Sequence, residues 1–202
     1  MSNELTFIHH FEKGASPQAP LLLLHGTGGN EHDLVSLGKA LAPGRSLLSP
    51  RGKILENGMP RFFRRLAEGV FDKEDVQNRA HELADFILAA QDAYGLAKPM
   101  AVGFSNGANI AAALLLLRPE ILSGAILLRA MVPLSEPPKA ELGQTPILLI
   151  SGANDPIIPL NNATRLAAML KSAGALVQHE ILPAGHNLTQ QDMTIASHWL
   201  NT

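Results

Sequence analysis

The sequence predicts an α/β protein with a mostly parallel sheet of about seven strands and helices on both faces. Short runs rich in Leu, Ile and Val alternate with longer stretches of helical spacing, as expected when parallel strands are buried between helices. The 202 residues, 46% hydrophobic and 17% charged, are enough for one sizeable core. We therefore expect a single domain over residues 1–202.

Seven apolar runs are the candidate strands. The first, residues 6–11, has the character of an edge strand or a hairpin arm. The other six cover residues 19–25, 45–49, 100–104, 124–128, 146–151 and 176–182. Because both faces of a parallel sheet are covered, near-continuous apolar runs such as "PLLLL" and "GAILL" fit its interior strands.

Helical spacing fills most of the gaps between these runs, and several helices have a polar residue where an N-cap belongs. The candidate caps are Asn30 for residues 31–42, Asp72 for about 73–94, and Asn161 or Asn162 for the segment up to 173. Gly95 and Gly174 stand where C-terminal caps are expected. A last helix is expected over about 188–200.

Three segments differ from an ordinary amphipathic pattern. The helix after residue 105, "ANIAAALLLL", is apolar almost all round, which predicts that it is buried. Residues 50–72 and 130–145 show no sustained period, so we predict two long loops there. Long loops in compact domains tend to be functional.

The composition excludes several classes of protein. The absence of cysteine rules out disulfides, thiolate metal sites and a cysteine nucleophile, and it fits a reducing compartment. A formal charge of -2 gives no general attraction to nucleic acid or anionic membranes. No apolar run approaches the length of a membrane span, and the N-terminus lacks the features of a signal peptide. We expect a cytoplasmic protein with no nucleic-acid partner.

One local cluster is basic. It consists of Arg51, Lys53, Arg61, Arg64 and Arg65. Such a cluster is usually a solvated face, and the alternative is contact with an anionic or polar part of a substrate. The sequence leaves both interpretations open.

A serine between two glycines, "GFSNG" at residues 103–107, is the strongest chemical motif. It follows an apolar strand and opens the buried helix, the strand-turn-helix setting that holds a serine hydroxyl clear of the sheet. The glycines lack the Cβ atoms that would clash where strand and helix pack closely, and Ser105 itself must accept a strained backbone. A helix-capping serine is the rival interpretation, but it explains neither glycine.

A serine nucleophile needs a base, and the base needs a third group to orient it. Both should lie where parallel strands end, and two later strands end in "SGANDPIIP" and "LPAGHNL". These contain Asp155 and His186, which follow Ser105 in the chain order of a nucleophile-elbow triad. Taken singly, Asp155 before a proline is also an ordinary turn residue, and His186 is also an ordinary loop residue.

Acyl transfer further requires hydrogen-bond donors for the developing oxyanion. We expect the backbone N–H of Asn106 to supply one, and the N–H of Thr27 in "LLLLHGTGG", with Gly28 as the fallback, to supply the other. His25 is interpreted as holding this loop by hydrogen bonding. The glycine-rich loop lacks the spacing of a phosphate-binding motif, and the histidines and carboxylates lack metal-ligand spacing, so we predict no metal.

These residues resemble the α/β-hydrolase superfamily, and more narrowly the phospholipase/carboxylesterase family, which includes acyl-protein thioesterases and small bacterial esterases. The resemblance runs from about residue 21 to 200, and its motifs are "LLLLHGTGGNEHDL", "SPRGKILENGMPRFFRRLAEGVFD", "GFSNGANIAAALLLLRPE", "ISGANDPIIP" and "PAGHNL". Two departures separate the chain from the acyl-protein thioesterases, which commonly have Gln at position 106 and Trp-Phe-Asp where this chain has "GVFD".

The resemblance implies an α/β-hydrolase fold without a large cap domain and hydrolysis of carboxylic esters or thioesters without a cofactor. It places the triad at Ser105, Asp155 and His186. It also makes residues 50–72 the wall of a substrate pocket, with Met131 facing it. The apolar pocket residues would then be Phe62, Phe63, Leu66 and Phe71, with ordinary core packing as the alternative.

We therefore expect a serine esterase that cleaves short or medium acyl esters through an acyl-enzyme. A lysophospholipase or acyl-protein thioesterase is the alternative within enzymes. A non-catalytic binding protein of the same fold is the alternative from another class. The expected partner is a small ester or thioester, and the sequence leaves a homodimer open.

Overall fold

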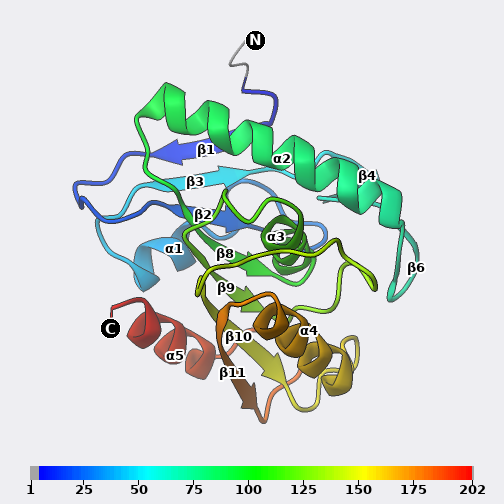
Figure 1. Ribbon diagram of the computed structural model, residues 1–202. Helices are drawn as coiled ribbons and strands as arrows, with labels where there is room; N and C mark the ends of the chain where they lie inside the picture. The colour runs from blue at the N-terminus through cyan, green and yellow to red at the C-terminus, as the bar shows by residue number, and fades with distance from the viewer. Residues whose placement is uncertain (1–4, 202) are drawn as a thin grey trace.

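The computed structural model describes residues 5–201 and contains the predicted α/β sheet (Figure 1). Its seven strands follow the order β1-β3-β2-β8-β9-β10-β11. Strand β1 is antiparallel to β3, and every other pairing in this sheet is parallel. The strands are β1 (His9–Glu12), β2 (Leu21–Leu24), β3 (Leu47–Pro50), β8 (Met100–Phe104), β9 (Gly124–Leu128), β10 (Pro146–Gly152) and β11 (Leu176–Leu182).

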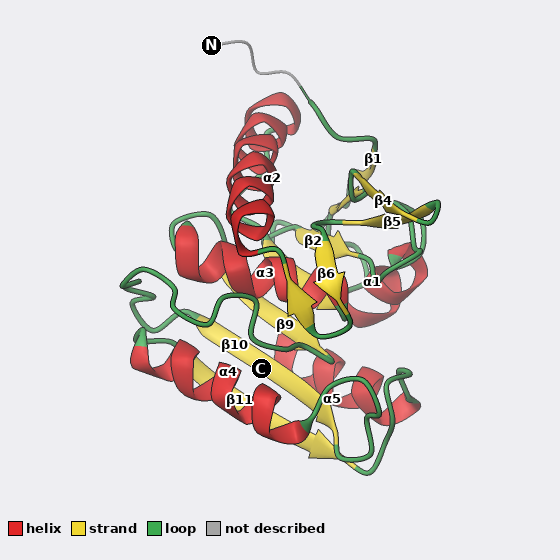
Figure 2. Cartoon of the chain, turned by 90° about the vertical axis from the view of Figure 1, so that its right-hand side faces the viewer, coloured by secondary structure: helices red, strands yellow, loops and turns green. Residues whose placement is uncertain are grey.

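The described residues form five helices, and these helices cover the two faces of the sheet (Figure 2). They are α1 (Val35–Leu41), α2 (Lys73–Tyr94), α3 (Asn106–Leu117), α4 (Leu160–Ser172) and α5 (Gln190–Leu200). Helices α2, α3 and α4 share one apolar core with one face of the strands, and α1 and α5 share the other. Alternation in β2 shows the division: Leu22 and Leu24 face the first core, whereas Leu21 and Leu23 face the second. The predicted α/β-hydrolase architecture is confirmed.

Local boundaries differ from the predictions at three helices. Helix α1 begins at Val35 because residues 31–34 form a turn, in which Asn30 accepts the His32 N–H rather than capping a helix. The N-cap of α4 is Pro159, and the predicted cap Asn162 instead accepts the Val132 N–H. Helix α5 begins at Gln190, two residues later than expected.

The prediction of a long loop over residues 50–72 was wrong. This segment contains two small hairpins, formed by β4 (Ile54–Glu56) with β5 (Met59–Arg61) and by β6 (Arg65–Ala67) with β7 (Val70–Phe71). Residues 130–145 contain no helix or strand, as expected. Within the described residues, no helix combines the length and the apolar character needed to cross a membrane.

Candidate active site

Ser105 lies on the sharp turn between β8 and α3. Its backbone has φ 51° and ψ −114°, a conformation that is rare for a residue with a side chain. The turn is held from both sides, because the Ser105 N–H donates to Leu128 O at 2.8 Å and the Asn109 N–H donates to Ser105 O at 2.9 Å. The serine hydroxyl is thereby presented above the carboxyl ends of the strands.

The structure brings His186 and Asp155 to this hydroxyl, although 81 residues separate Ser105 from His186 in the sequence. His186 Nε2 lies 3.0 Å from Ser105 Oγ, and His186 Nδ1 lies 2.8 Å from Asp155 Oδ2. A carboxylate accepts, so Nδ1 carries the proton and Nε2 presents its lone pair to the serine. These contacts are the ones a general base requires.

Asp155 contributes to a turn and also contacts His186, so its two interpretations are compatible. Its Oδ1 accepts the N–H groups of Ile157 and Ile158 at 2.8 and 3.0 Å, while Oδ2 is left for the imidazole. The Asp155 side chain is 1% exposed and that of His186 is 16% exposed. The turn hydrogen bonds thus fix the carboxylate, and the imidazole edge stays open to the cavity.

The loop after β2 passes beside Ser105. The N–H of Gly28 donates to Pro60 O at 2.9 Å, so the fallback donor is already engaged and Thr27 is the better candidate. On the other side, Asn106 is the first residue of α3, where backbone N–H groups have no partner within the helix. Thr27 and Asn106 both line the cavity that contains Ser105.

His25 holds this loop, as the sequence indicated. Its Nδ1 lies 2.7 Å from Gly26 O, and its Nε2 accepts the Gly52 N–H at 3.0 Å. Burial lowers the pKa of His25, because a charged ring is costly away from water. The neutral ring therefore joins the loop after β2 to the segment after β3.

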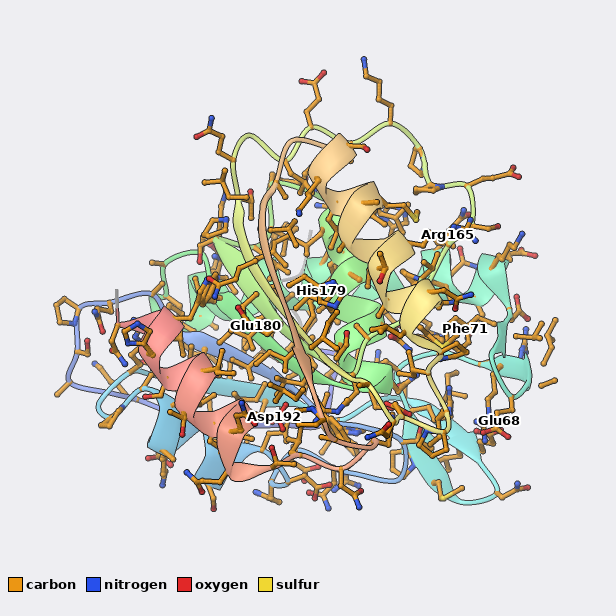
Figure 3. The ribbon with its side chains drawn as sticks, turned by 90° about the horizontal axis from the view of Figure 1, so that it is seen from below. Glu68, Phe71, Arg165, His179, Glu180 and Asp192 are labelled. Carbon is orange, nitrogen blue, oxygen red and sulfur yellow. The ribbon has the colours of Figure 1, made fainter. Side chains whose placement is uncertain are left out.

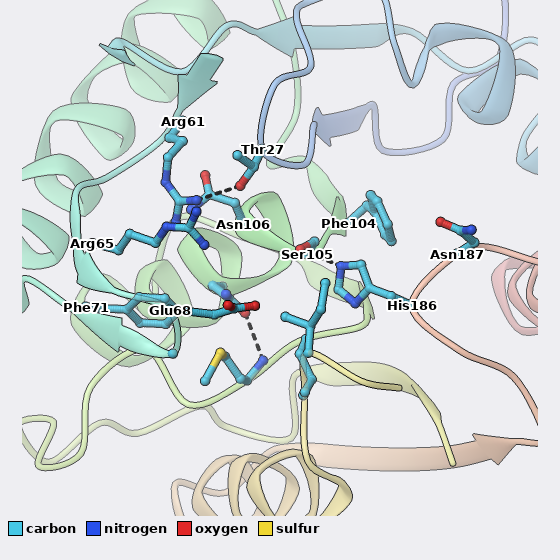
Figure 4. Close-up of a pocket in the computed structure, with 15 residues that line it drawn as sticks. Thr27, Arg61, Arg65, Glu68, Phe71, Phe104, Ser105, Asn106, His186 and Asn187 are labelled. Carbon is cyan, nitrogen blue, oxygen red and sulfur yellow. Dashed lines mark hydrogen bonds between the residues drawn. The ribbon is translucent and has the colours of Figure 1, made fainter. Parts of the chain in front are cut away.

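A cavity of about 280 Å³ opens over Ser105 (Figure 4). Of the expected pocket residues, Phe71 and Met131 line this cavity, whereas Phe62 and Phe63 are buried in the core and Leu66 is exposed outside it. The remaining lining is more polar than expected. It comprises Thr27, Arg61, Arg65, Glu68, Gly69, Phe104, Asn106, Asn109, Ile157, Ile158, His186 and Asn187.

Sequence reasoning missed several of these lining residues. Ile157 and Ile158 lie two and three residues after Asp155, and Asn109 lies one helical turn after Ser105, so their proximity to Asp155 and Ser105 was available from spacing. Glu68 had no such signal, because its position depends on the hairpin formed by β6 and β7. Figure 3 shows Glu68 and Phe71 together at that edge of the molecule.

The basic cluster divides into two groups. Three of its residues form ion pairs and do not line the cavity. The pairs are Arg51 with Glu31, Lys53 with Glu82 and Arg64 with Asp72. Arg61 and Arg65 both contact Glu56 and both line the cavity. Among residues 5–201, no group of three or more His, Asp or Glu residues is placed to hold a metal ion.

The fold and the geometry at Ser105 are those of an α/β hydrolase. The chain belongs to the phospholipase/carboxylesterase family, whose pattern it matches over residues 8–202. It is therefore a hydrolase of the carboxylesterase type.

Individual relatives agree with this assignment. The putative hydrolase MhqD of Bacillus subtilis (strain 168) is 45% identical over 193 residues, which span 95% of this chain and 96% of MhqD. The carboxylesterase of Bacillus cereus superposes with a TM-score of 0.94 at 43% identity, covering 97% of this chain and 94% of that one. YahD, solved with malic acid, gives a TM-score of 0.92 at 32% identity, covering 97% and 98% of the two chains.

Proposed function

We propose that this protein hydrolyses carboxylic esters of short or medium acyl chains through an acyl-enzyme formed on Ser105. The observation that supports this most directly is the continuous hydrogen-bonded series from Ser105 through His186 to Asp155. His186 Nε2 takes the hydroxyl proton as Ser105 Oγ attacks the carbonyl carbon, and the protonated imidazole then delivers that proton to the departing alcohol.

In the second half of the reaction, water replaces the alcohol. His186 removes a proton from the water, the resulting hydroxide attacks the acyl carbon, and Ser105 leaves with the proton returned by the imidazole. The N–H groups of Thr27 and Asn106 are the proposed donors for the oxyanion in both steps. Asp155 keeps the imidazole oriented and stabilises its positive charge.

The small cavity supports the short acyl preference over the lysophospholipase and acyl-protein thioesterase alternatives. A volume of about 280 Å³ lies at the lower limit for small-molecule sites. Large apolar side chains line part of it, but a long acyl chain would exceed this volume and would have to lie across the surface. A clear preference for long-chain esters or for thioesters would favour those alternatives.

Replacing Ser105 tests the assignment. Ser105→Ala should reduce kcat for p-nitrophenyl acetate by several orders of magnitude, on the order of what removal of a triad member costs in other serine hydrolases, while the circular dichroism spectrum stays native. A fluorophosphonate probe should label the parent protein at Ser105. Undiminished turnover in Ser105→Ala would overturn the mechanism, and an unlabelled, inactive parent protein would favour a non-catalytic binding protein.

The natural ester is best sought with a panel that varies acyl length, leaving group and charge. YahD has been solved with malic acid, which is a dicarboxylic acid. For this chain, that finding is a reason to include esters that carry a free carboxylate.

A further inference from the structure

Two arginines share one carboxylate beside the nucleophile. Arg61 Nη1 lies 3.2 Å from Glu56 Oε2, and Arg65 Nε donates to Glu56 Oε1 at 2.8 Å. The Arg61 side chain is only 4% exposed, and that of Arg65 is 31% exposed. Two guanidinium charges against one carboxylate leave this group with a net positive charge at the wall of the cavity.

The guanidinium groups are held in place rather than free in solvent. Arg61 Nη1 donates to Thr27 Oγ1 at 2.7 Å, and Arg61 Nε donates to Phe63 O at 3.2 Å. Arg65 uses Nε for Glu56, and Figure 4 shows its guanidinium beside that of Arg61, directed into the cavity. A partly buried positive charge of this kind is stabilised by an anion that pairs with it and accepts its hydrogen bonds.

A third donor lies beside them. The Asn106 side chain is buried, and its Oδ1 accepts the Phe62 N–H at 2.8 Å, which fixes the amide plane. Its Nδ2 is buried and has no hydrogen-bond partner among the described residues. This end of the cavity therefore has more donors than acceptors. The acid that also lines the cavity, Glu68, lies on the turn between β6 and β7 and is exposed.

We propose that the Arg61–Arg65 end of the cavity binds a free carboxylate on the ester substrate, so that the substrate class is small half-esters of dicarboxylic acids. This inference rests on the proposed function, because it concerns the same cavity. A planar carboxylate matches the fork of a guanidinium. The limited volume favours a compact molecule in which the carboxylate lies a few atoms from the scissile carbonyl.

Charge-matched substrates test the proposal. Monoethyl glutarate carries the carboxylate, and ethyl glutaramate has the same shape with a neutral amide in its place. The parent protein should show a kcat/KM at least tenfold higher for the acid than for the amide. Arg65→Gln should bring this ratio close to one, and Glu68→Gln should raise it, because that variant removes the negative charge from the lining.

Arg64→Gln is the matched control, because Arg64 is exposed, pairs with Asp72 and does not line the cavity. It should keep the parental ratio. Equal kcat/KM for acid and amide in the parent, or the same loss of ratio in Arg64→Gln and Arg65→Gln, would overturn the proposal. If the parent protein hydrolysed none of these esters, including p-nitrophenyl acetate, that result would instead contradict the proposed function.

A separate cluster lies behind the loop that carries His186. Arg129 directly follows β9 and is fully buried, with a backbone φ of 55°. Its Nε donates to Gly185 O at 2.9 Å and its Nη2 donates to Asn187 O at 3.2 Å. These carbonyl groups belong to the two residues that flank His186. The Arg129 side chain therefore forms hydrogen bonds to the loop on both sides of the proposed base.

Arg129 is itself anchored by a buried acid on α5. Its Nη1 and Nη2 donate to the two oxygens of Asp192 at 2.6 and 2.9 Å, and both side chains are 0% exposed. Figure 3 shows Asp192 on the first part of α5. Asp192 also accepts the Thr189 N–H and hydroxyl, each at 2.7 Å. The start of α5, the end of β9 and the His186 loop are thus one hydrogen-bonded unit.

We infer that Arg129 is a positioning residue that keeps His186 aligned with Ser105 and Asp155. This inference also depends on His186 being the base. A lysine at position 129 retains the charge but cannot donate to two carbonyls and a carboxylate in the same fixed geometry. Arg129→Lys should therefore lower kcat for p-nitrophenyl acetate at least tenfold and leave KM within threefold of the parental value.

Arg45→Lys is the matched control, since Arg45 is also buried and donates to Leu200 O at the far end of α5. Arg45→Lys should retain the parental kcat when the two proteins are compared at the same concentration of folded protein. The downfield proton resonance of the His186–Asp155 hydrogen bond should weaken in Arg129→Lys and persist in Arg45→Lys. Should Arg129→Lys not fold, Asp192→Asn applies the same measurements. Equal kcat and equal resonances in the variants of both sites would overturn the inference.

Discussion

At the scale of single residues, the turn at Ser105 explains why the motif contains two glycines. A Cβ on Gly107 would lie 1.9 Å from Leu24 O, and a Cβ on Gly103 would lie 2.6 Å from Gly107 O. Both contacts are with backbone, which cannot move aside cheaply. The glycines let β8, α3 and β2 approach closely, while the strain is carried by Ser105, the residue that supplies the hydroxyl.

This strain predicts an unusual order of stability at position 105. At ordinary positions glycine is less stable than alanine by about 0.5–1 kcal/mol. At φ 51° and ψ −114° a Cβ is unfavourable, at a cost of about 1–3 kcal/mol. Ser105→Gly should therefore unfold in urea with a free energy about 1 kcal/mol higher than that of Ser105→Ala. Both variants lack the hydroxyl, and a higher stability for the alanine variant would show that the turn is unstrained.

Ser105, Asp155 and His186 could be proposed as a group from the sequence, because each comes shortly after an apolar strand and parallel strands all end at one edge of the sheet. The Arg129–Asp192 pair was not predictable in this way, because 63 residues separate its members and neither lies in a local motif. The phenylalanines of residues 62–71 were also not separable by sequence into core residues and cavity residues. Phe62 and Phe63 belong to the core, whereas Phe71 lines the cavity, and hydrophobicity is common to all three.

At the scale of elements, one of the two hairpins in residues 50–72 has a signal in the sequence. Asn57 and Gly58 connect β4 to β5, and their φ angles of 52° and 80° are both positive. Asn-Gly is the preferred pair for such a two-residue turn. The flanking strands are only three residues long, so no alternating pattern was available to identify them.

Helix α5 depends on its first turn. Thr189 is the N-cap, and Asp192 completes a capping box by accepting the Thr189 N–H. Because Asp192 also holds Arg129, the cap connects the stability of α5 to the loop of His186. The sequence predicted a helix over about 188–200, two residues longer than α5 at its start, and no cap was predicted for it.

The cap gives a second stability prediction. Thr189→Ala removes the hydroxyl that accepts the backbone N–H of Asp192. This substitution should lower the free energy of unfolding by about 1 kcal/mol. Thr194→Ala is the control in the same helix, because Thr194 is exposed and its hydroxyl donates to Gln190 O within that helix. That substitution should change stability by less than about 0.5 kcal/mol. Urea unfolding followed by circular dichroism measures both, and equal losses would exclude a capping role.

At the scale of the whole molecule, two of the contacts between the loop after β2 and the segment after β3 involve titratable groups. One is the hydrogen bond from the Gly52 N–H to His25, and the other is the ion pair between Arg51 and Glu31. The Glu31 carboxylate accepts from Arg51 Nη2 at 2.7 Å and also from Nε. The proposed oxyanion loop therefore depends on two groups whose interactions change in acid.

The ion pair between Arg51 and Glu31 determines how the stability of the fold changes as the pH falls. The hydrogen bond from Arg51 lowers the pKa of Glu31 from 4.5 to about 2. Because the folded pKa lies below the unfolded value, this stabilisation is complete above pH 4.5 and is lost as the pH falls towards 2. The Arg51 side chain is 37% exposed and screened by solvent, so we expect a contribution of about 1 kcal/mol rather than the full value of the shift.

Urea unfolding between pH 6 and pH 3 measures this contribution. Glu31→Gln should be less stable than the parent protein at pH 6, and the difference should shrink at pH 3, because the parental carboxylate is then losing its advantage over the unfolded state. Glu141→Gln, at an exposed position, should follow the parental curve throughout. A stability difference between Glu31→Gln and the parent that stays constant from pH 6 to pH 3 would mean that the Arg51 contact does not govern the acid sensitivity of the fold.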